Sequence, residues 1–254
     1  MAWNRVVHLP STDSTNTHLM RGLTTEPEAW PHLSALVAHE QTAGRGRAGR
    51  SWHSRPGASL TVSFVLRPDD GAPPTPWIPL LVGLAVRRAL TPWVATSLKW
   101  PNDVLLATGA DPLHNAGASD GGEWGWAPKL GGILCELHPT RALVAGVGIN
   151  CQESPDELPV PWAASIASAT GSSPDPAEVL DALGTTVPQV LADWASHPAR
   201  VREEYEAASA VVGNEVAVGD VRGRAVGIAD DGALLVETAG GVVPVTVGDV
   251  DRAR

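Results

Sequence analysis

A short cationic segment, residues 44–52, is the part of this sequence best suited to chemistry. It reads Gly-Arg-Gly-Arg-Ala-Gly-Arg-Ser-Trp, in a chain whose net charge is −10. Glycine lets a backbone approach a ligand closely, and the guanidinium groups of Arg45, Arg47 and Arg50 match phosphate and carboxylate. Trp52 adds an aromatic face that either covers a ligand or packs. We predict a loop, the Arg loop, that closes on an anion; a solvated hairpin turn is the alternative.

Four more polar clusters stand at the ends of predicted helices and strands. They are residues 13–16 (Asp-Ser-Thr-Asn), 99–103 (Lys-Trp-Pro-Asn-Asp), 129–132 (Lys-Leu-Gly-Gly) and 146–150 (Gly-Val-Gly-Ile-Asn). Each has an ordinary structural explanation, since such residues also cap helices, form turns, allow close strand packing or lie in solvent. Loops gathered at one edge of a sheet commonly build sites, so we expect these clusters and the Arg loop to meet there.

Hydrophobic periodicity divides the chain into an α+β part and a short all-β part. Alternation through residues 59–66 is typical of a strand, and further strands are predicted at 3–9, 33–40, 95–100, 104–106, 130–137 and 142–149. Helices are predicted after the cap at 11–16 and at 77–91, 162–169, 177–194 and 199–207. Short strands at 216–218, 223–228, 233–237 and 242–247 predict a small β-barrel. We place the domains at 1–209 and 210–254.

Composition argues against several classes of function. The net charge of −10 disfavours general nucleic-acid binding. The two cysteines, Cys135 and Cys151, lack the spacing of a zinc site or redox pair, which fits a reducing cytoplasm. The N-terminal segment does not resemble a signal peptide, and the longest apolar stretch, residues 77–93, is interrupted by Pro79 and two arginines. We expect a cytoplasmic protein with no membrane association.

Taken in order across residues 3–150, the five clusters resemble the motifs of the biotin protein ligase family, and the β-rich tail fits as well. The resemblance implies an α+β fold: a catalytic domain with a mixed or antiparallel sheet of the biotin/lipoate ligase type, followed by an SH3-like β-barrel. It also implies a two-step reaction. Biotin's carboxylate attacks the α-phosphate of ATP, giving biotinyl-5′-adenylate and pyrophosphate. A lysine of an acceptor protein then takes the biotin and releases AMP.

The resemblance further implies which residues form the site. Those expected to bind biotin are Ser14, Thr15, Asn16, Gln41, Arg45, Gly46, Arg47 and Lys129. Those expected to bind ATP or the adenylate are Gly44, Gly49, Arg50, Trp52, Asn102 and Asn150. The catalytic candidates are Lys129, Arg47 and Asp103. Lys129 and Arg47 are included because an anion attacks another anion slowly unless fixed cations surround it. Mg²⁺ is expected with ATP, without an assigned ligand, and Asp103 would orient Mg²⁺, Lys129 or an arginine.

The implied partner is the biotin carboxyl carrier domain of an acyl-CoA or pyruvate carboxylase. The 13–16 motif leaves no room before it for the DNA-binding domain that some members carry, so we expect no operator binding. A monomer or weak homodimer is expected. Residues 107–128 exceed the short turn expected before Lys129 and are predicted to be a surface loop.

Two other functions stay open. A lipoate or octanoate ligase or transferase would share the catalytic core, although the Arg loop and residues 99–103 argue against it. A non-catalytic biotin sensor would be expected to lack Lys129 or the arginines, and the sequence retains both.

Overall fold

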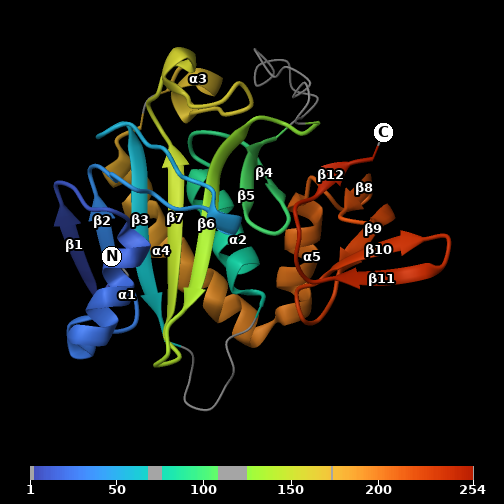
Figure 1. The fold of residues 1–254 in the computed structure, drawn as a ribbon, viewed down its shortest axis with the longest axis horizontal. Coiled ribbons are helices and arrows are strands. Elements are labelled where there is room, and N and C mark those ends of the chain that lie inside the picture. The colour runs from blue at the N-terminus through green and yellow to red at the C-terminus, as the bar shows by residue number, and fades with distance from the viewer. Residues whose placement is uncertain (1–2, 68–75, 108–124, 173, 254) are drawn as a thin grey trace.

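The computed structural model describes residues 3–67, 76–107, 125–172 and 174–253. A seven-stranded sheet forms the larger part, and a five-stranded sheet made by the C-terminal residues lies beside it (Figure 1). Most of the surface loop predicted at 107–128, including His114, lies outside the described residues.

The central sheet is mixed, one of the two arrangements that the family resemblance implies, and its strand order is β1-β2-β3-β7-β6-β5-β4. β1 (Arg5–Leu9) and β2 (Ser34–Ala38) run parallel, and the remaining neighbours pair antiparallel. The other strands are β3 (Ser59–Leu66), β4 (Thr96–Lys99), β5 (Asp103–Leu106), β6 (Lys129–Leu137) and β7 (Leu143–Asn150). All seven predicted strands are confirmed, with slightly shifted ends.

Alternation along β3 sends its side chains into two cores on opposite faces of the sheet. Phe64 joins the large core that includes α2 (Ile78–Leu90) and α4 (Pro176–Ser196). Val65, one residue on, packs in a smaller core with α1 (Thr15–Thr25). Burying each such side chain contributes roughly 1.5–3 kcal/mol. Figure 1 shows α2 and α4 behind the sheet and α1 in front of it, so α1 leaves part of the front face of β6 and β7 uncovered.

The helix predicted over 162–169 is wrong in extent, because α3 covers only Ile166–Thr170. The residues before it pair with the start of β6 instead: Lys129 N donates to Trp162 O at 2.7 Å, and Ala164 N donates to Lys129 O at 2.8 Å. These bonds engage backbone groups that a helix would need. Single 3-10 turns occur at Pro27–Ala29 (η1), Arg47–Gly49 (η2) and Pro155–Glu157 (η4).

The C-terminal strands form an open antiparallel sheet rather than the closed barrel that the sequence predicts. Their order is β11-β10-β9-β8-β12, so β11 and β12 lie at the two edges. A barrel requires its edge strands to pair, and β12 has only two residues. The strands are β8 (Glu215–Val218), β9 (Val221–Ile228), β10 (Leu234–Thr238), β11 (Gly241–Val245) and β12 (Asp251–Arg252).

Three buried tryptophans and helix α5 (Pro198–Ala208) join the two sheets. Each indole nitrogen donates a hydrogen bond to a backbone carbonyl near the C-terminus. The bonds run from Trp77 to Asp230 at 3.1 Å, from Trp100 to Gly232 at 3.1 Å and from Trp126 to Val250 at 3.2 Å. The C-terminal sheet is therefore fixed against the larger part.

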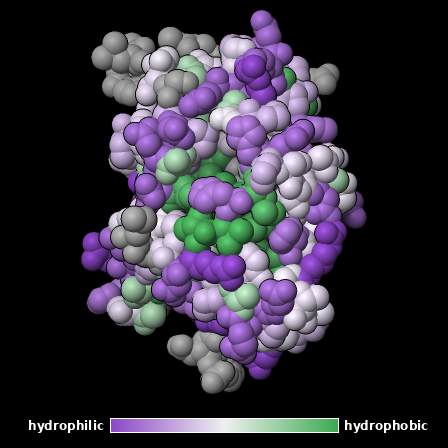
Figure 2. Space-filling model, turned by 90° about the vertical axis from the view of Figure 1, so that its left-hand side faces the viewer, coloured by the Kyte–Doolittle hydropathy of each residue, from purple (hydrophilic) through white to green (hydrophobic). Residues whose placement is uncertain are grey.

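The face around β1 combines apolar and hydrophilic surface. β1 is an edge strand, and its Val6 and Val7 are half-buried. Seen from the left-hand side of Figure 1, apolar side chains gather in the middle of the molecule and hydrophilic ones surround them (Figure 2). None of the helices in the described ranges has the length and apolar character needed to span a membrane.

Candidate active site

A cavity of about 280 Å³ lies between the start of α1, the Arg loop and the front face of β6 and β7, a size that suits a small ligand. Asp103 pairs with Gly132, which in turn pairs with Gly148. The clustered strand ends therefore lie at the same end of the sheet. Residues from all five predicted clusters line the cavity, so the expectation that they meet is confirmed. A further wall comes from the segment before α3, which supplies Pro159, Val160, Trp162 and Ala163.

The Arg loop folds back on itself. Arg45 and Ser51 form an antiparallel bridge, and the turn between them includes η2. Ala48 and Gly49 have φ angles of 53° and 74°, in the left-handed region that favours glycine. The loop thus has the hairpin shape of the alternative interpretation, and it also lines the cavity.

Each arginine of the loop is held by a different part of the chain. The acceptors of Arg45, Arg47 and Arg50 are, in order, Glu136 on β6, Asn102 in the β4–β5 turn and Asp249 near the C-terminus, at 2.8, 3.0 and 2.7 Å. Although burial raises the pKa of the Asp249 carboxyl, the ion pair with Arg50 holds it below its usual range. The loop is therefore tied to three elements.

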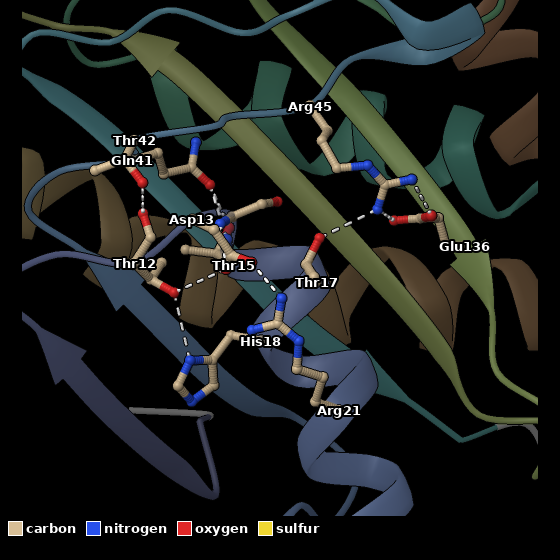
Figure 3. A network of polar contacts seen from close by, with 11 residues as sticks. Thr12, Asp13, Thr15, Thr17, His18, Arg21, Gln41, Thr42, Arg45 and Glu136 are labelled. Carbon is tan, nitrogen blue, oxygen red and sulfur yellow. Dashed lines mark hydrogen bonds and ion pairs between the residues drawn. The ribbon is translucent and has the colours of Figure 1, made fainter.

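A buried polar network lies behind the cavity, partly drawn in Figure 3. Gln41 Oε1 accepts hydrogen bonds from Thr15 N at 2.8 Å and Thr15 Oγ1 at 3.1 Å. The Ser63 hydroxyl lies 2.6 Å from both Thr15 Oγ1 and Asn16 Oδ1. Ser14 is the N-cap of α1, but its hydroxyl makes no capping hydrogen bond. Short polar side chains are thus fixed by one another, as buried polar groups require.

Two lysines approach the carboxylate of Asp103, which is 8% exposed. Lys129 Nζ lies 2.6 Å from Asp103 Oδ1, and Lys99 Nζ lies 3.9 Å from Oδ2. Burial lowers the pKa of the Lys99 ammonium, and the Asp103 carboxylate opposes that shift. Lys129 lines the cavity, so this arrangement places a cation there with a carboxylate to orient it.

Trp52 lies against a glycine floor on β6 and β7. A Cβ at Gly148 would come within 2.6 Å of the Trp52 ring, and one at Gly132 within 3.3 Å. The Lys129 ammonium lies 5.8 Å from the ring centre, in cation–π range. The indole nitrogen is buried with no hydrogen-bond partner among the described residues. The two glycines are therefore needed for close approach of the ring.

Most of the site residues predicted from the sequence line the cavity. They are Ser14, Thr15, Asn16, Gln41, Arg45, Gly46, Arg47, Arg50, Trp52, Asn102, Asp103, Lys129 and Asn150. Gly44 and Gly49 do not line it. Gly44 O accepts a hydrogen bond from Trp52 N at 2.9 Å, so it shapes the base of the loop. The sequence assigned no role to Ser63, Glu136 or Asp249; for Glu136 the available signal was its spacing of four residues after Gly132 on a strand.

No cluster of three metal-binding side chains occurs within the described ranges. Asp103 is the carboxylate that lines the cavity, and a lysine already pairs with it, so these residues do not form a resident Mg²⁺ site. Burial raises the pKa of both cysteine thiols to about 12, which favours the protonated thiol at neutral pH.

The fold places the chain in a class of ligases with a mixed sheet and a small C-terminal β domain. Biotin protein ligase from Aquifex aeolicus, in complex with biotin and ATP, matches with a TM-score of 0.78 and 29% identity, covering 99% of this chain and 100% of that one. Residues 8–152 match the biotin/lipoate A/B protein ligase family, and residues 213–252 match the biotin protein ligase C-terminal domain.

Curated relatives agree with this class. The biotin–[acetyl-CoA-carboxylase] ligase of Mycobacterium tuberculosis is 31% identical over 99% of this chain and 90% of its own length. The bifunctional ligase/repressor BirA of Bacillus subtilis is 29% identical over 87% of this chain, and the match spans 66% of that relative's length. The chain belongs to the biotin/lipoate A/B protein ligase family.

Proposed function

We propose that this protein is an ATP-dependent biotin protein ligase. The observation that supports the proposal most is one cavity that combines the buried polar network with Lys129 and the arginines of the loop. Activating a carboxylate brings it next to a triphosphate, and fixed cations offset the repulsion between them. The similarity to ligases whose names or complexes include biotin and ATP points the same way.

The reaction has two steps. A biotin carboxylate oxygen attacks the α-phosphorus of ATP, the bond to the β-phosphate oxygen breaks, and pyrophosphate leaves with Mg²⁺. The amine of an acceptor lysine then attacks the acyl carbon of the adenylate. The bond to AMP breaks, the nitrogen loses a proton, and an amide forms.

The polar network is proposed to bind the ureido ring of biotin. Since Gln41 Oε1 is engaged by Thr15, the Gln41 amide nitrogen is the group that can donate to a ligand carbonyl. Ser14 offers a hydroxyl that does not cap α1. Asn16 donates both amide hydrogens to the protein, to Leu134 O at 3.0 Å and Glu136 Oε2 at 2.9 Å, so its part is to support the pocket wall.

Lys129 is proposed as the central catalytic residue, contacting the biotin carboxylate and the α-phosphate. Asp103 orients it across 2.6 Å. Arg47 is proposed to neutralise charge at the same point, while Gly46 lets the loop backbone approach. Arg50, Trp52, Asn102 and Asn150 are assigned to the nucleotide, and Mg²⁺ arrives as part of the ATP substrate.

The Arg loop is also proposed to retain the adenylate after the first step, because closure keeps water from a reactive anhydride. We expect Arg47→Ala to release free adenylate, since it breaks the bond to Asn102 that holds the loop over the cavity. The measurement is adenylate in the medium without acceptor, together with diffuse labelling of bystander lysines. If neither rises, the loop has no retention role.

The decisive test incubates the protein with ATP, Mg²⁺, biotin and a biotin carboxyl carrier domain, and measures the mass of the carrier. A gain of one biotin is expected, and no gain with lipoate or octanoate in its place. The match of residues 213–252 to the biotin protein ligase C-terminal domain favours biotin over those acids. Biotin binding without mass gain would support the non-catalytic sensor instead.

The carrier domain of an acyl-CoA or pyruvate carboxylase is proposed as the acceptor. We also propose a catalytic domain at 1–209 with a C-terminal domain at 210–254, a cytoplasmic location and a monomer or weak homodimer. An absence of operator binding stays a prediction, which a gel shift with biotin operon DNA tests.

A further inference from the structure

Glu136 touches two parts of the biotin pocket without lining the cavity itself, and we propose that it is the positioning residue for that pocket. It fixes Arg45 of the Arg loop and Asn16 of α1 in one arrangement. This inference rests on the function proposed above and assigns a role to a residue outside the cavity lining.

The contacts of Glu136 are specific. Arg45 Nη2 donates to Oε1 at 2.8 Å and Arg45 Nη1 donates to Oε2 at 3.1 Å, which makes a bidentate pair. Oε2 also accepts from Asn16 Nδ2 at 2.9 Å. Figure 3 shows Arg45 reaching from the loop to Glu136 on β6, with Thr17 of α1 beside the guanidinium. One carboxylate thus joins three elements.

The backbone brings Glu136 to this point. Side chains two apart on a strand share a face, so Gly132, Leu134 and Glu136 lie on the cavity side of β6. Gly146 on the neighbouring β7 has no Cβ, and a Cβ there would overlap Asn16. Asn16 can therefore lie against the sheet, where it is 3% exposed, and reach Glu136.

The Glu136 tie differs from the other ion pair of the loop. The Arg45–Glu136 side chains are 48% and 23% exposed, whereas those of Arg50 and Asp249 are 56% and 55% exposed. Exposed ion pairs contribute little, but the Glu136 carboxylate is partly buried, and its bidentate contact and further hydrogen bond fix the geometry of the pair. We therefore expect Glu136 to fix the position of the start of the Arg loop, where Arg45 lies.

The test is Glu136→Gln, which keeps the shape of the side chain but removes its charge and one acceptor. Biotin affinity measured by calorimetry should weaken about tenfold, as expected for losing hydrogen bonds to charged groups. The KM for biotin should rise similarly, while kcat at saturating biotin and the KM for ATP should stay within about twofold. Trypsin should cut the Arg loop faster, because the loop loses its tie to β6.

The matched control is Asp193→Asn, which removes a carboxylate paired with Arg88 at 2.7 Å, outside the cavity lining. It should leave biotin affinity and loop cleavage unchanged. Glu136→Asp keeps the charge on a shorter side chain and should give an intermediate loss of biotin affinity. This variant replaces Glu136→Gln as the test if the glutamine variant does not fold. In the Arg45→Met background, Glu136→Gln should weaken biotin affinity less than it does in the wild type, because the contact with Arg45 is already lost and only the contact with Asn16 is left to disturb.

The proposal is overturned if Glu136→Gln leaves either biotin affinity or tryptic cleavage of the loop unchanged. Failure of the proposed function looks different, because the wild-type protein would then add no biotin to the carrier domain. The cleavage measurement needs no ligand and still reports whether Glu136 holds the loop.

Discussion

Asp103 holds the two lysines of the site at different distances, and this difference separates their roles. Lys129 lies 2.6 Å from the carboxylate and lines the cavity, while Lys99 lies 3.9 Å away and is 5% exposed. The buried Lys99, whose pKa is lowered by burial, is a poor candidate for contact with substrate. We therefore propose Lys129, rather than Lys99, as the cation that contacts the substrate.

Lys129→Ala should lower the rate of adenylate formation by about 10²–10³, since it removes one fixed charge from the transition state. Biotin binding should be largely retained, because the ureido contacts come from other residues. Biotin-dependent pyrophosphate exchange measures the first step alone, and calorimetry measures the binding. Normal exchange in the variant would rule out the assignment.

Glu153 offers a residue-scale test of stability. It is 3% exposed, Ser59 donates to its Oε1, and Oε2 has no partner among the described residues. Burial raises the pKa of this carboxyl above its ordinary value of 4.5. The folded state thus binds the proton more tightly than the unfolded state, so this group makes stability fall as the pH rises above that value.

Glu153→Gln mimics the protonated side chain and should escape this loss. Relative to wild type, the variant should gain stability between about pH 4 and pH 7, measured by urea unfolding at both values. Glu157→Gln is the control. Hydrogen bonds from Ser154 lower the pKa of Glu157, so this variant should lose stability relative to wild type as the pH rises. A pH-independent difference for Glu153→Gln would contradict the prediction.

At the scale of elements, the glycines of β6 and β7 let other side chains pack directly against the cavity floor. The residues at 132, 146 and 148 are glycines, which lack a Cβ at the points where Trp52 and Asn16 approach. Trp52 and Asn16 can therefore approach the sheet closely because the strand residues opposite them have no side chain.

Gly148→Ala should displace Trp52, since the new Cβ would lie within 2.6 Å of its ring. Overpacking of this kind costs about 1–3 kcal/mol, which urea unfolding can measure. Adding Trp52→Ala removes the clash, so Gly148→Ala should cost much less in that background. Equal costs in both backgrounds would show that the ring does not lie on the floor in solution.

At the scale of the whole molecule, the C-terminal sheet reaches the site through two kinds of contact. Trp100, in the β4–β5 turn beside the cavity, donates to Gly232 O, and Asp249 pairs with Arg50 of the Arg loop. The larger part and the C-terminal sheet also share one continuous apolar core. We therefore expect the two parts to unfold together.

Trp100→Phe should destabilise the protein by about 1–3 kcal/mol, because it leaves the Gly232 carbonyl without its donor. Urea unfolding should stay a single transition with an earlier midpoint, and hydrogen exchange should quicken in β9 and β10. An unchanged midpoint would mean that this bond does not join the sheets.

The strands of the larger sheet, four of the five C-terminal strands and most helices are predictable from the sequence. Nearly all of the site residues predicted from the motifs also line the cavity. Local pattern is sufficient for these, since alternation specifies a strand wherever one face is buried, and the motif residues stand at strand ends that the fold gathers. The C-terminal strands were also predictable, but their closure was not, because it depends on pairing between edges.

The contacts of the three loop arginines, in contrast, depend on the folded chain. The partners Glu136, Asn102 and Asp249 lie 91, 55 and 199 residues away in the chain, and no local pattern specifies such contacts. The segment before α3 was misjudged for the same reason, since pairing with Lys129 outweighs its helical pattern. The sequence shows which charged groups the loop carries, but their partners are acceptors that only the folded chain brings within hydrogen-bond distance.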